Sequence, residues 1–314
     1  MDIADLKKLA QQTRSSREMG LSLILASLLL GIFLFVPLAP KNTPSAISVA
    51  TSTIPDAFAN VPIEAEAAIV YDLSTGQTLY AKNADAQLPL ASLTKLLTVY
   101  AALSELPPNT PITISASATR LGSPRAFSVG QTFALADLAR LTLTASLNDG
   151  AEAIAEATAS RESRSQNEML AGAAAALNLK QTYAVNGSGL DVNAAISGGY
   201  GSAHDLARLA GALVQKAPDV AEATTNSSAQ AVSEGGKSFN VMNTDPMIGS
   251  VPNLLLSKTG YTDLAGGNLA IVFDSGIGHP IAVVVLGSSQ KARFTDSTML
   301  IAATFAHFAG VASL

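Results

Sequence analysis

The sequence contains no cysteine and few aromatic or charged residues. The absence of cysteine excludes disulfide frameworks, thiolate zinc sites and cysteine nucleophiles. Aromatic residues make up only 5% and alanine is abundant, which favours closely packed helices over an aromatic-rich β-sandwich. Charged residues make up 14% with a net charge of −5, so we expect no nucleic acid partner. Apolar residues make up 48% of the 314, which is ample material for a core.

A long uncharged segment lies near the N-terminus. Residues 19–40 (MGLSLILASLLLGIFLFVPLAP) are mostly Leu, Ile, Phe, Val and Ala. About 20 apolar residues are enough to cross a bilayer as a helix. The basic residues before the segment are Lys7, Lys8, Arg14 and Arg17. By the positive-inside rule, we expect residues 1–18 to be cytoplasmic and everything after the span to be exported.

A cleaved signal peptide is the alternative to a permanent anchor. The apolar segment is longer than the usual core of about 7–15 residues in signal peptides. Two sequences of the small-x-small cleavage type, at residues 48–50 and 57–59, lie well downstream of it. We therefore expect a transmembrane signal-anchor at 19–40. Residues 41–60 are rich in Ser, Thr, Pro and Ala and are expected to form a linker.

The exported part, residues 61–314, shows strands, then helices, then strands again. Apolar runs at 67–72 and 78–82 around a Ser-Thr-Gly-Gln turn predict a hairpin. Ala- and Leu-rich helices are expected over about 131–215. Strands follow at 254–257, 268–274 and 281–286, and a closing helix covers about 296–311. This order predicts an α+β fold in which an antiparallel sheet is flanked by a mainly helical subdomain.

Ser92 and Lys95 are the first candidate catalytic pair. The segment LPLASLTKLLTVYAAL has apolar residues at helical spacing, so a buried helix is expected to open near Ser92. Residues three apart share one helix face, which brings the Lys95 amine within reach of the Ser92 hydroxyl. A lysine whose pKa is lowered by burial can take the proton of a serine nucleophile. The pattern alone is weak, because Ser288 and Lys291 match it equally well.

Two further short patterns follow in the chain. Ser146-Leu147-Asn148 offers a hydroxyl to relay a proton and an amide to bind a carbonyl, although segments beginning at Ser165 and Ser238 match too. Lys258-Thr259-Gly260 directly ends a predicted apolar strand and supplies a cation, a hydroxyl donor and a close backbone approach.

The order of these patterns, S-x-x-K, S-x-N and K-T-G, resembles the motif set of penicillin-binding proteins and class A β-lactamases. Longer segments resemble the D-alanyl-D-alanine carboxypeptidases of peptidase family S11. They include AAIVYDLSTGQTLYAKNADAQLPLAS, FSVGQTFALADLARLTLTASLNDGAEAIAE, SKTGYTDLAGGNLA and KARFTDS. The likeness covers roughly residues 62–312. It implies a bacterial wall enzyme with peptidoglycan stem peptides as substrate and β-lactam antibiotics as covalent inhibitors.

The resemblance also implies catalytic roles. Ser92 would be acylated and Lys95 would be its base. Ser146 would relay the proton to the leaving amine, and Lys258 would support it electrostatically.

The same resemblance implies substrate-binding roles. Asn148 would contact the substrate backbone, and Gly260 would let the substrate approach. The amide of Tyr261, with that of the nucleophile, would form the oxyanion hole. Thr259 and Arg293 would hold the terminal carboxylate of the peptide, since arginine pairs a carboxylate through two donors.

Two positions depart from the family pattern. The turn Asn186-Gly187-Ser188-Gly189-Leu190 lacks the proline of the family's N-P-x-G-L turn. Leu147 stands where the family commonly has glycine in S-x-N, so we expect it to shape the wall of the cleft and the substrate preference.

Three other functions remain to be weighed. A class A β-lactamase needs a glutamate in a Glu-x-x-Leu-Asn pattern, and here Ala174 stands three before Leu177-Asn178. Penicillin should therefore leave Ser92 slowly. A D,D-endopeptidase that cuts cross-links is favoured less because Arg293 suits a free carboxylate. A non-catalytic, wall-binding homologue would be expected to lack a motif residue, and none is missing.

The histidines are the remaining candidates for metal binding. His204, His279 and His307 lack close metal-ligand spacing, so we expect structural histidines, no metal and no cofactor. The expected location is the bacterial cytoplasmic membrane, single-pass, with the catalytic domain on the extracytoplasmic side.

Overall fold

The computed structural model describes residues 19–28, 56–161, 163–276 and 278–310. The chain divides into two units, Met1–Thr53 and Ile54–Leu314, each described here by itself. In the first unit, residues 19–28 are helical. Within the described ranges, no helix is both long and apolar enough to cross a membrane. Residues 29–40 of the predicted span and 41–55 of the predicted linker lie outside the described residues, so both stay predictions.

The second unit is built on a five-stranded antiparallel sheet in the order β10-β11-β12-β1-β2. Its strands are β1 (Ala67–Asp72), β2 (Thr78–Lys82), β10 (Leu254–Thr262), β11 (Gly266–Asp274) and β12 (Pro280–Ser288). Because β1 pairs with both β2 and β12, the N-terminal hairpin and the late strands share one sheet, and the predicted α+β fold is confirmed.

One strand boundary was wrong. β10 does not end before Lys258 but runs on to Thr262, because Gly260 still pairs with Asn268 of β11. Lys258, Thr259 and Gly260 therefore lie inside a strand on the edge of the sheet. Their backbone is held by the ladder on one side only.

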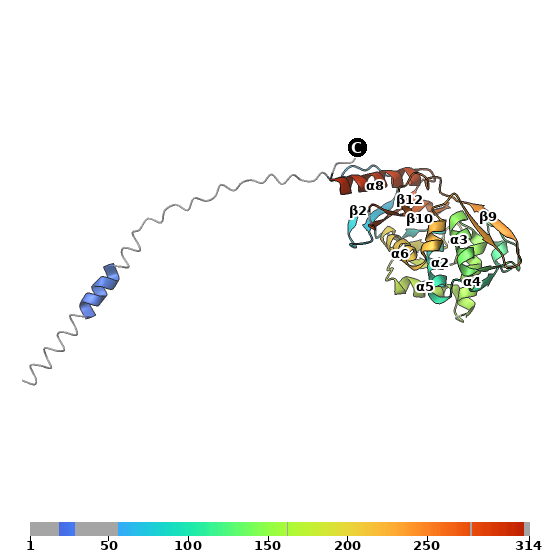
Figure 1. The fold of residues 1–314 in the computed structure, drawn as a ribbon, viewed down its shortest axis with the longest axis horizontal. Coiled ribbons are helices and arrows are strands. Elements are labelled where there is room, and N and C mark those ends of the chain that lie inside the picture. The colour runs from blue at the N-terminus through green and yellow to red at the C-terminus, as the bar shows by residue number, and fades with distance from the viewer. Residues whose placement is uncertain (1–18, 29–55, 162, 277, 311–314) are drawn as a thin grey trace, which may run out of the picture. The chain divides into compact units, whose positions relative to one another are not determined.

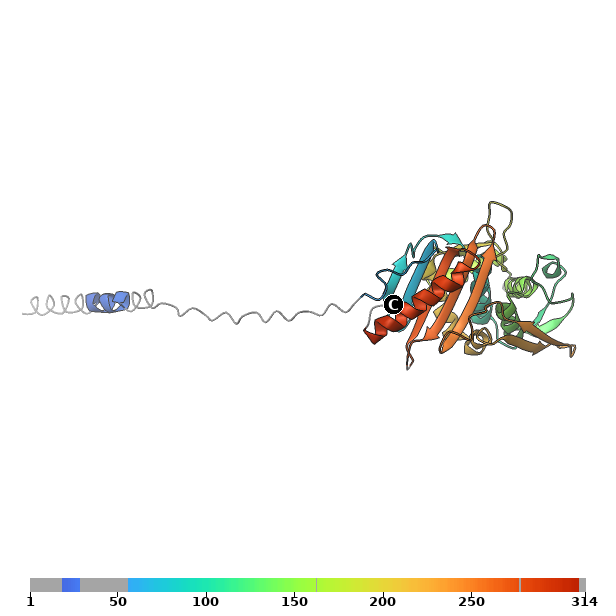
Figure 2. The same cartoon turned by 90° about the horizontal axis from the view of Figure 1, so that it is seen from above.

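Helices cover both faces of the sheet (Figures 1 and 2). One face carries α8 (Ala292–Ala309), which starts four residues earlier than predicted and so includes Arg293. The other face carries the helical subdomain. Its helices are α2 (Thr94–Glu105), α3 (Leu135–Ala145), α4 (Asn148–Arg161), α5 (Gln166–Ala176), α6 (Ala203–Lys216) and α7 (Pro218–Ala223).

Short strands and 3-10 turns complete the helical subdomain. The strands are β3 (Leu88–Pro89), β4 (Pro111–Thr113), β5 (Thr132–Ala134), β6 (Tyr183–Ala184), β7 (Gly199–Gly201), β8 (Ser228–Val232) and β9 (Ser238–Met242). The turns are η1 (Ala91–Leu93) and η2 (Ala118–Arg120). The short strands form three small sheets, β3-β7-β6, β4-β5 and β8-β9.

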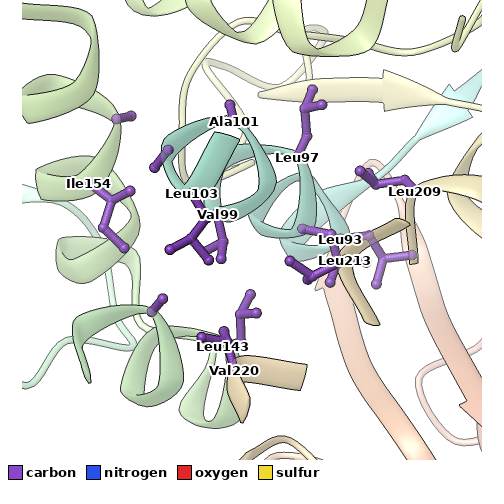
Figure 3. Packing of buried hydrophobic residues seen from close by; sticks show 14 of the residues in the cluster. Leu93, Leu97, Val99, Ala101, Leu103, Leu143, Ile154, Leu209, Leu213 and Val220 are labelled. Atoms are coloured by element: carbon purple, nitrogen blue, oxygen red, sulfur yellow. The ribbon is translucent and has the colours of Figure 1, made fainter. Parts of the chain in front are cut away.

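The sheet separates two apolar clusters. Strands β11 and β12 are buried on both faces, which explains their continuous apolar runs. The larger cluster lies between the sheet and the helical subdomain, where Leu93 and Leu97 lie near Leu209 and Leu213 of α6 (Figure 3). Helix α2 runs through this cluster, so the segment that follows Ser92 is anchored in the core.

Leu147 belongs to this larger cluster and is only 3% exposed. The expectation that its side chain shapes the cleft wall was therefore wrong. The turn between α3 and α4 leaves the neighbouring Ser146 in a left-handed conformation, with φ of 59°, and directs Leu147 into the core. Its contribution is to stability.

We predict that Leu147→Ala lowers the free energy of unfolding by about 2–5 kcal/mol, because truncating a buried leucine leaves a cavity. Urea unfolding followed by circular dichroism measures this loss. Val129→Ala, at a side chain that is 59% exposed, serves as the control and should change little. A change in substrate preference at unaltered stability would contradict the core assignment.

Candidate active site

Ser92 lies in the 3-10 turn η1, directly before α2. The preceding residue, Ala91, has a left-handed φ of 48°, and Gly189 packs against its carbonyl. A Cβ on Gly189 would lie 2.0 Å from the Ala91 oxygen, and Gly189 itself has φ of 77°. Only glycine fits there. Ser92 stays half-buried between buried Ala91 and Leu93.

The Lys95 amine is completely buried and has three polar neighbours. Its Nζ donates to Ser92 Oγ at 2.8 Å, to Asn148 Oδ1 at 2.8 Å and to the Ser188 carbonyl at 2.7 Å. Two of these acceptors cannot give up a proton, whereas the Ser92 hydroxyl can. A neutral Lys95 would therefore keep two N–H bonds and turn its lone pair to Ser92.

Burial is the main cause that holds the pKa of Lys95 well below its ordinary value. The positive charge of Lys258 lowers that pKa further, and Asp149 opposes the shift. The lowered pKa favours the neutral amine, the form that can accept a proton from Ser92.

The Ser188 carbonyl comes from the turn at residues 186–190 that lacks the family's proline. The Asn186 side chain closes this turn instead, since its Oδ1 accepts from Ser188 N, Ser188 Oγ and Gly189 N. The sequence pattern located the turn but did not indicate that its carbonyl contacts Lys95.

Ser146 and Lys258 form a second hydroxyl–amine pair. Lys258 is 1% exposed, and its Nζ donates to Ser146 Oγ at 2.9 Å and to the Thr259 carbonyl at 2.8 Å. Burial and then the Arg293 guanidinium lower the pKa of Lys258 to about 7, against the opposing charge of Asp245. Near neutral pH this amine is therefore partly charged. An amine that can be charged or neutral suits a group that influences proton transfer at Ser146.

The competing motif matches have structural partners. Ser288 donates to Asp296 at 2.8 Å. Ser165 forms a capping box at the start of α5 with Glu168. Ser238 opens β9. None of these three serines is bonded to a lysine in the part of the chain that the structure describes.

Asn148, at the start of α4, uses both ends of its amide within the protein. Besides accepting from Lys95, it donates from Nδ2 to the Gly122 carbonyl at 2.9 Å. Here it holds the Lys95 amine. Its predicted contact with the substrate backbone stays a prediction.

Strand β10 runs past the Ser92 turn. A Cβ on Gly260 would lie 3.0 Å from the Leu90 carbonyl and 3.3 Å from the Ser92 nitrogen, so glycine lets this strand approach without a tight contact. The next residue, Tyr261, is 45% exposed. The approach of β10 to the Ser92 amide agrees with the predicted pairing of the Ser92 and Tyr261 amides in an oxyanion hole.

Thr259 and Arg293 are both next to Gly260, Thr259 along strand β10 and Arg293 through a hydrogen bond. Arg293 is 8% exposed rather than solvated, and its Nη1 donates to the Gly260 carbonyl at 2.5 Å. The hydroxyl of Thr259 is 2.7 Å from that of Thr244. Sequence reasoning did not single out Thr244 or its neighbour Asp245, because residues 243–245 carry no motif.

The histidines have partners away from these lysines. His204 lies 3.0 Å from Asp85, and His279 lies 2.8 Å from Asp72. His307 packs its ring against Phe58. Among the described residues, no group of three or more His, Cys, Asp and Glu side chains could hold a metal ion.

Known proteins resemble this chain over nearly all of the second unit. The family model for D-alanyl-D-alanine carboxypeptidases, peptidase family S11, matches residues 52–290. A D-alanyl-D-alanine endopeptidase of Pseudomonas aeruginosa is 31% identical over 81% of this chain and 83% of its own length. The D-alanyl-D-alanine carboxypeptidase DacF of Bacillus subtilis is 28% identical over 91% of this chain and 71% of its own.

A solved structure agrees with these relatives. Penicillin-binding protein D2 from Listeria monocytogenes, in an ampicillin-bound form, aligns with a TM-score of 0.67 and 28% identity over 78% of this chain and 99% of that one. With its serine–lysine pairs in hydrogen-bonding contact on this fold, the chain belongs to the D-alanyl-D-alanine carboxypeptidases of peptidase family S11.

Proposed function

We propose that this protein removes the terminal D-alanine from peptidoglycan stem peptides through an acyl-enzyme on Ser92. The observation that carries the proposal is the contact between Ser92 and a buried Lys95 whose other two neighbours, Asn148 and Ser188, are fixed acceptors. This arrangement leaves the serine as the one neighbour able to lose its proton to the amine.

The reaction follows from the residues in place. Lys95 takes the Ser92 proton as Oγ bonds to the carbonyl carbon before the last D-alanine, and the resulting oxyanion lies at the Ser92 and Tyr261 amides. Ser146, held by Lys258, passes a proton to the departing amine as the peptide bond breaks. Water then hydrolyses the ester and regenerates the Ser92 hydroxyl. Outside the catalytic groups, Arg293 supplies a cation for the carboxylate of the leaving residue.

Penicillin enters the same pathway, because its lactam carbonyl can acylate Ser92. Ampicillin is bound in the related Listeria structure. Rapid hydrolysis of the penicilloyl ester on Ser92 would need a carboxylate that activates water. At the position where class A β-lactamases carry that glutamate, this chain has Ala174, which is 3% exposed inside the larger apolar cluster. A long-lived penicilloyl-enzyme is the result.

We predict that fluorescent penicillin labels the purified protein and that Ser92→Ala abolishes the label. Ser288→Ala, in the other S-x-x-K match, is the matched control and should keep it. Gel fluorescence after a chase with unlabelled penicillin also measures the lifetime of the ester. Label that persists in Ser92→Ala would rule out this nucleophile, and an unlabelled wild type would favour a wall-binding role without catalysis.

A second activity, cleavage of cross-links, is favoured by one observation: the Pseudomonas relative, at 31% identity, is named an endopeptidase. The buried Arg293 favours a substrate whose leaving residue carries a free carboxylate, as a terminal D-alanine does.

We predict that purified muropeptide pentapeptides lose one alanine and that cross-linked dimers stay largely intact. Mass spectrometry of the digests distinguishes the two products.

Arg293→Lys should slow removal of the terminal alanine by roughly 10-fold or more, because an ammonium lacks the two-pronged geometry. Rapid conversion of dimers to monomers would instead assign the endopeptidase activity.

We also propose that residues 19–40 anchor the enzyme in the cytoplasmic membrane with its catalytic domain outside. Support comes from the apolar run and the basic residues before it. The packing of the segment at 57–59 argues against cleavage there. Ala57 is fully buried, and the ring of Phe58 contacts those of Tyr80 and His307.

We predict that the native protein stays in the membrane pellet after alkaline extraction and migrates at its full mass of 32.1 kDa. In spheroplasts, added protease should digest the catalytic domain and spare an N-terminal epitope tag. A smaller, extractable protein without the tag would show that the segment is a cleaved signal peptide.

A further inference from the structure

Asp245 is a buried carboxylate beside the strand that carries Lys258. It is 3% exposed, and both of its oxygens are held. Ser257 Oγ donates to Oδ2 at 2.5 Å, and the Met247 amide donates to Oδ1 at 2.8 Å. Ser257 is the residue directly before Lys258, so the carboxylate is tied to β10 at the position next to the lysine.

The segment at residues 243–245 also bridges the two walls of the site. The Thr244 amide donates to the carbonyl of Thr144, which lies two residues before Ser146 at the end of α3. The Thr244 hydroxyl contacts Thr259 on β10. Asp245 therefore belongs to the connection that sets Ser146 and Lys258 opposite each other.

The charges around this connection are unequal. Lys95, Lys258 and Arg293 are three basic side chains that are each less than a tenth exposed. Asp149 acts on Lys95, whereas Asp245 acts on both Lys258 and Arg293 and favours their charged forms.

The remaining charged neighbours are Tyr261, which favours the charged form of Arg293 as Asp245 does, and the basic side chains themselves, which repel one another. Lys258 feels the repulsion of Arg293, Lys95 and Lys258 repel each other, and Tyr261 acts on Arg293. Buried cations without a nearby anion lose their charge or destabilise the fold. Asp245 is thus the carboxylate that acts on both Lys258 and Arg293.

We propose that Asp245 is a positioning residue that, through Ser257 and through its charge, keeps Lys258 ionised and aligned for the reaction at Ser146, with Arg293 as its second cationic neighbour. This rests on the proposed function, because it assigns work to Lys258 as a cation in proton transfer.

The test is the pH dependence of acylation by fluorescent penicillin in Asp245→Asn. The amide keeps the shape of the carboxylate and loses its charge. Without that anion the pKa of Lys258 falls below about 7, so the cationic form is lost at a lower pH. The alkaline limb of the acylation rate should move down by about one pH unit, which makes the loss about 10-fold at alkaline pH and small at acidic pH.

Asp205→Asn is the matched control. Asp205 is also a buried aspartate, 5% exposed, but it accepts from Gln181 and Thr182 and is not among the charges that act on Lys258 or Arg293. Its variant should keep the wild-type pH profile. Ser257→Ala, which leaves Asp245 charged but frees one oxygen, should shift the limb in the same direction by less, and it replaces Asp245→Asn if that variant does not fold.

A uniform loss of rate at every pH, or an unshifted profile in either variant, would overturn the assignment of Asp245. Such a result would leave the proposed function intact, because wild type would still be labelled at Ser92. An unlabelled wild type would instead sink the proposed function itself.

Discussion

The burial of two lysine amines beside two serine hydroxyls is the constraint on which the rest of the site depends. An ammonium group loses much of its stabilisation when water is removed, so burial favours the neutral amine. Lys95 and Lys258 are almost fully buried and close enough to repel each other. The fold meets this demand with fixed oxygen atoms, such as the carbonyls of Ser188 and Thr259.

This demand explains why the site lies at the junction of the sheet and the helical subdomain. A single element could not surround an amine on all sides. Lys95 comes from α2, its acceptors from α4 and the turn at 186–190, and Lys258 comes from the edge strand β10. Glycines at 189 and 260 ease the approach of these backbones, and at 189 any side chain would collide with the Ala91 carbonyl.

Much of the fold followed from the sequence because its signals are local. Strand hairpins, helical spacing and motif order predicted the antiparallel sheet, the helical subdomain and the meeting of Ser92, Lys95, Ser146 and Lys258. Local signals could not distinguish Ser288 from Ser92 as isolated matches, and only the tertiary partner of Ser288, an aspartate, explains its structural role.

The errors and omissions share one cause, since each depends on a partner far away in the chain. β10 is longer than its apolar run because β11 pairs with the polar end of the strand. Leu147 occupies the core because a left-handed turn at Ser146 directs it there. Asp245 lies in no recognised motif, and its link to the site is a hydrogen bond from Ser257, the residue before Lys258.

The packing of Ala174 has a consequence for the emergence of drug resistance. A single codon change to glutamate would restore the residue that class A β-lactamases use, but the new carboxylate would enter an apolar cluster where its charge is costly. The scaffold therefore opposes the step from penicillin target to penicillin-destroying enzyme with a loss of stability, which further substitutions would have to offset.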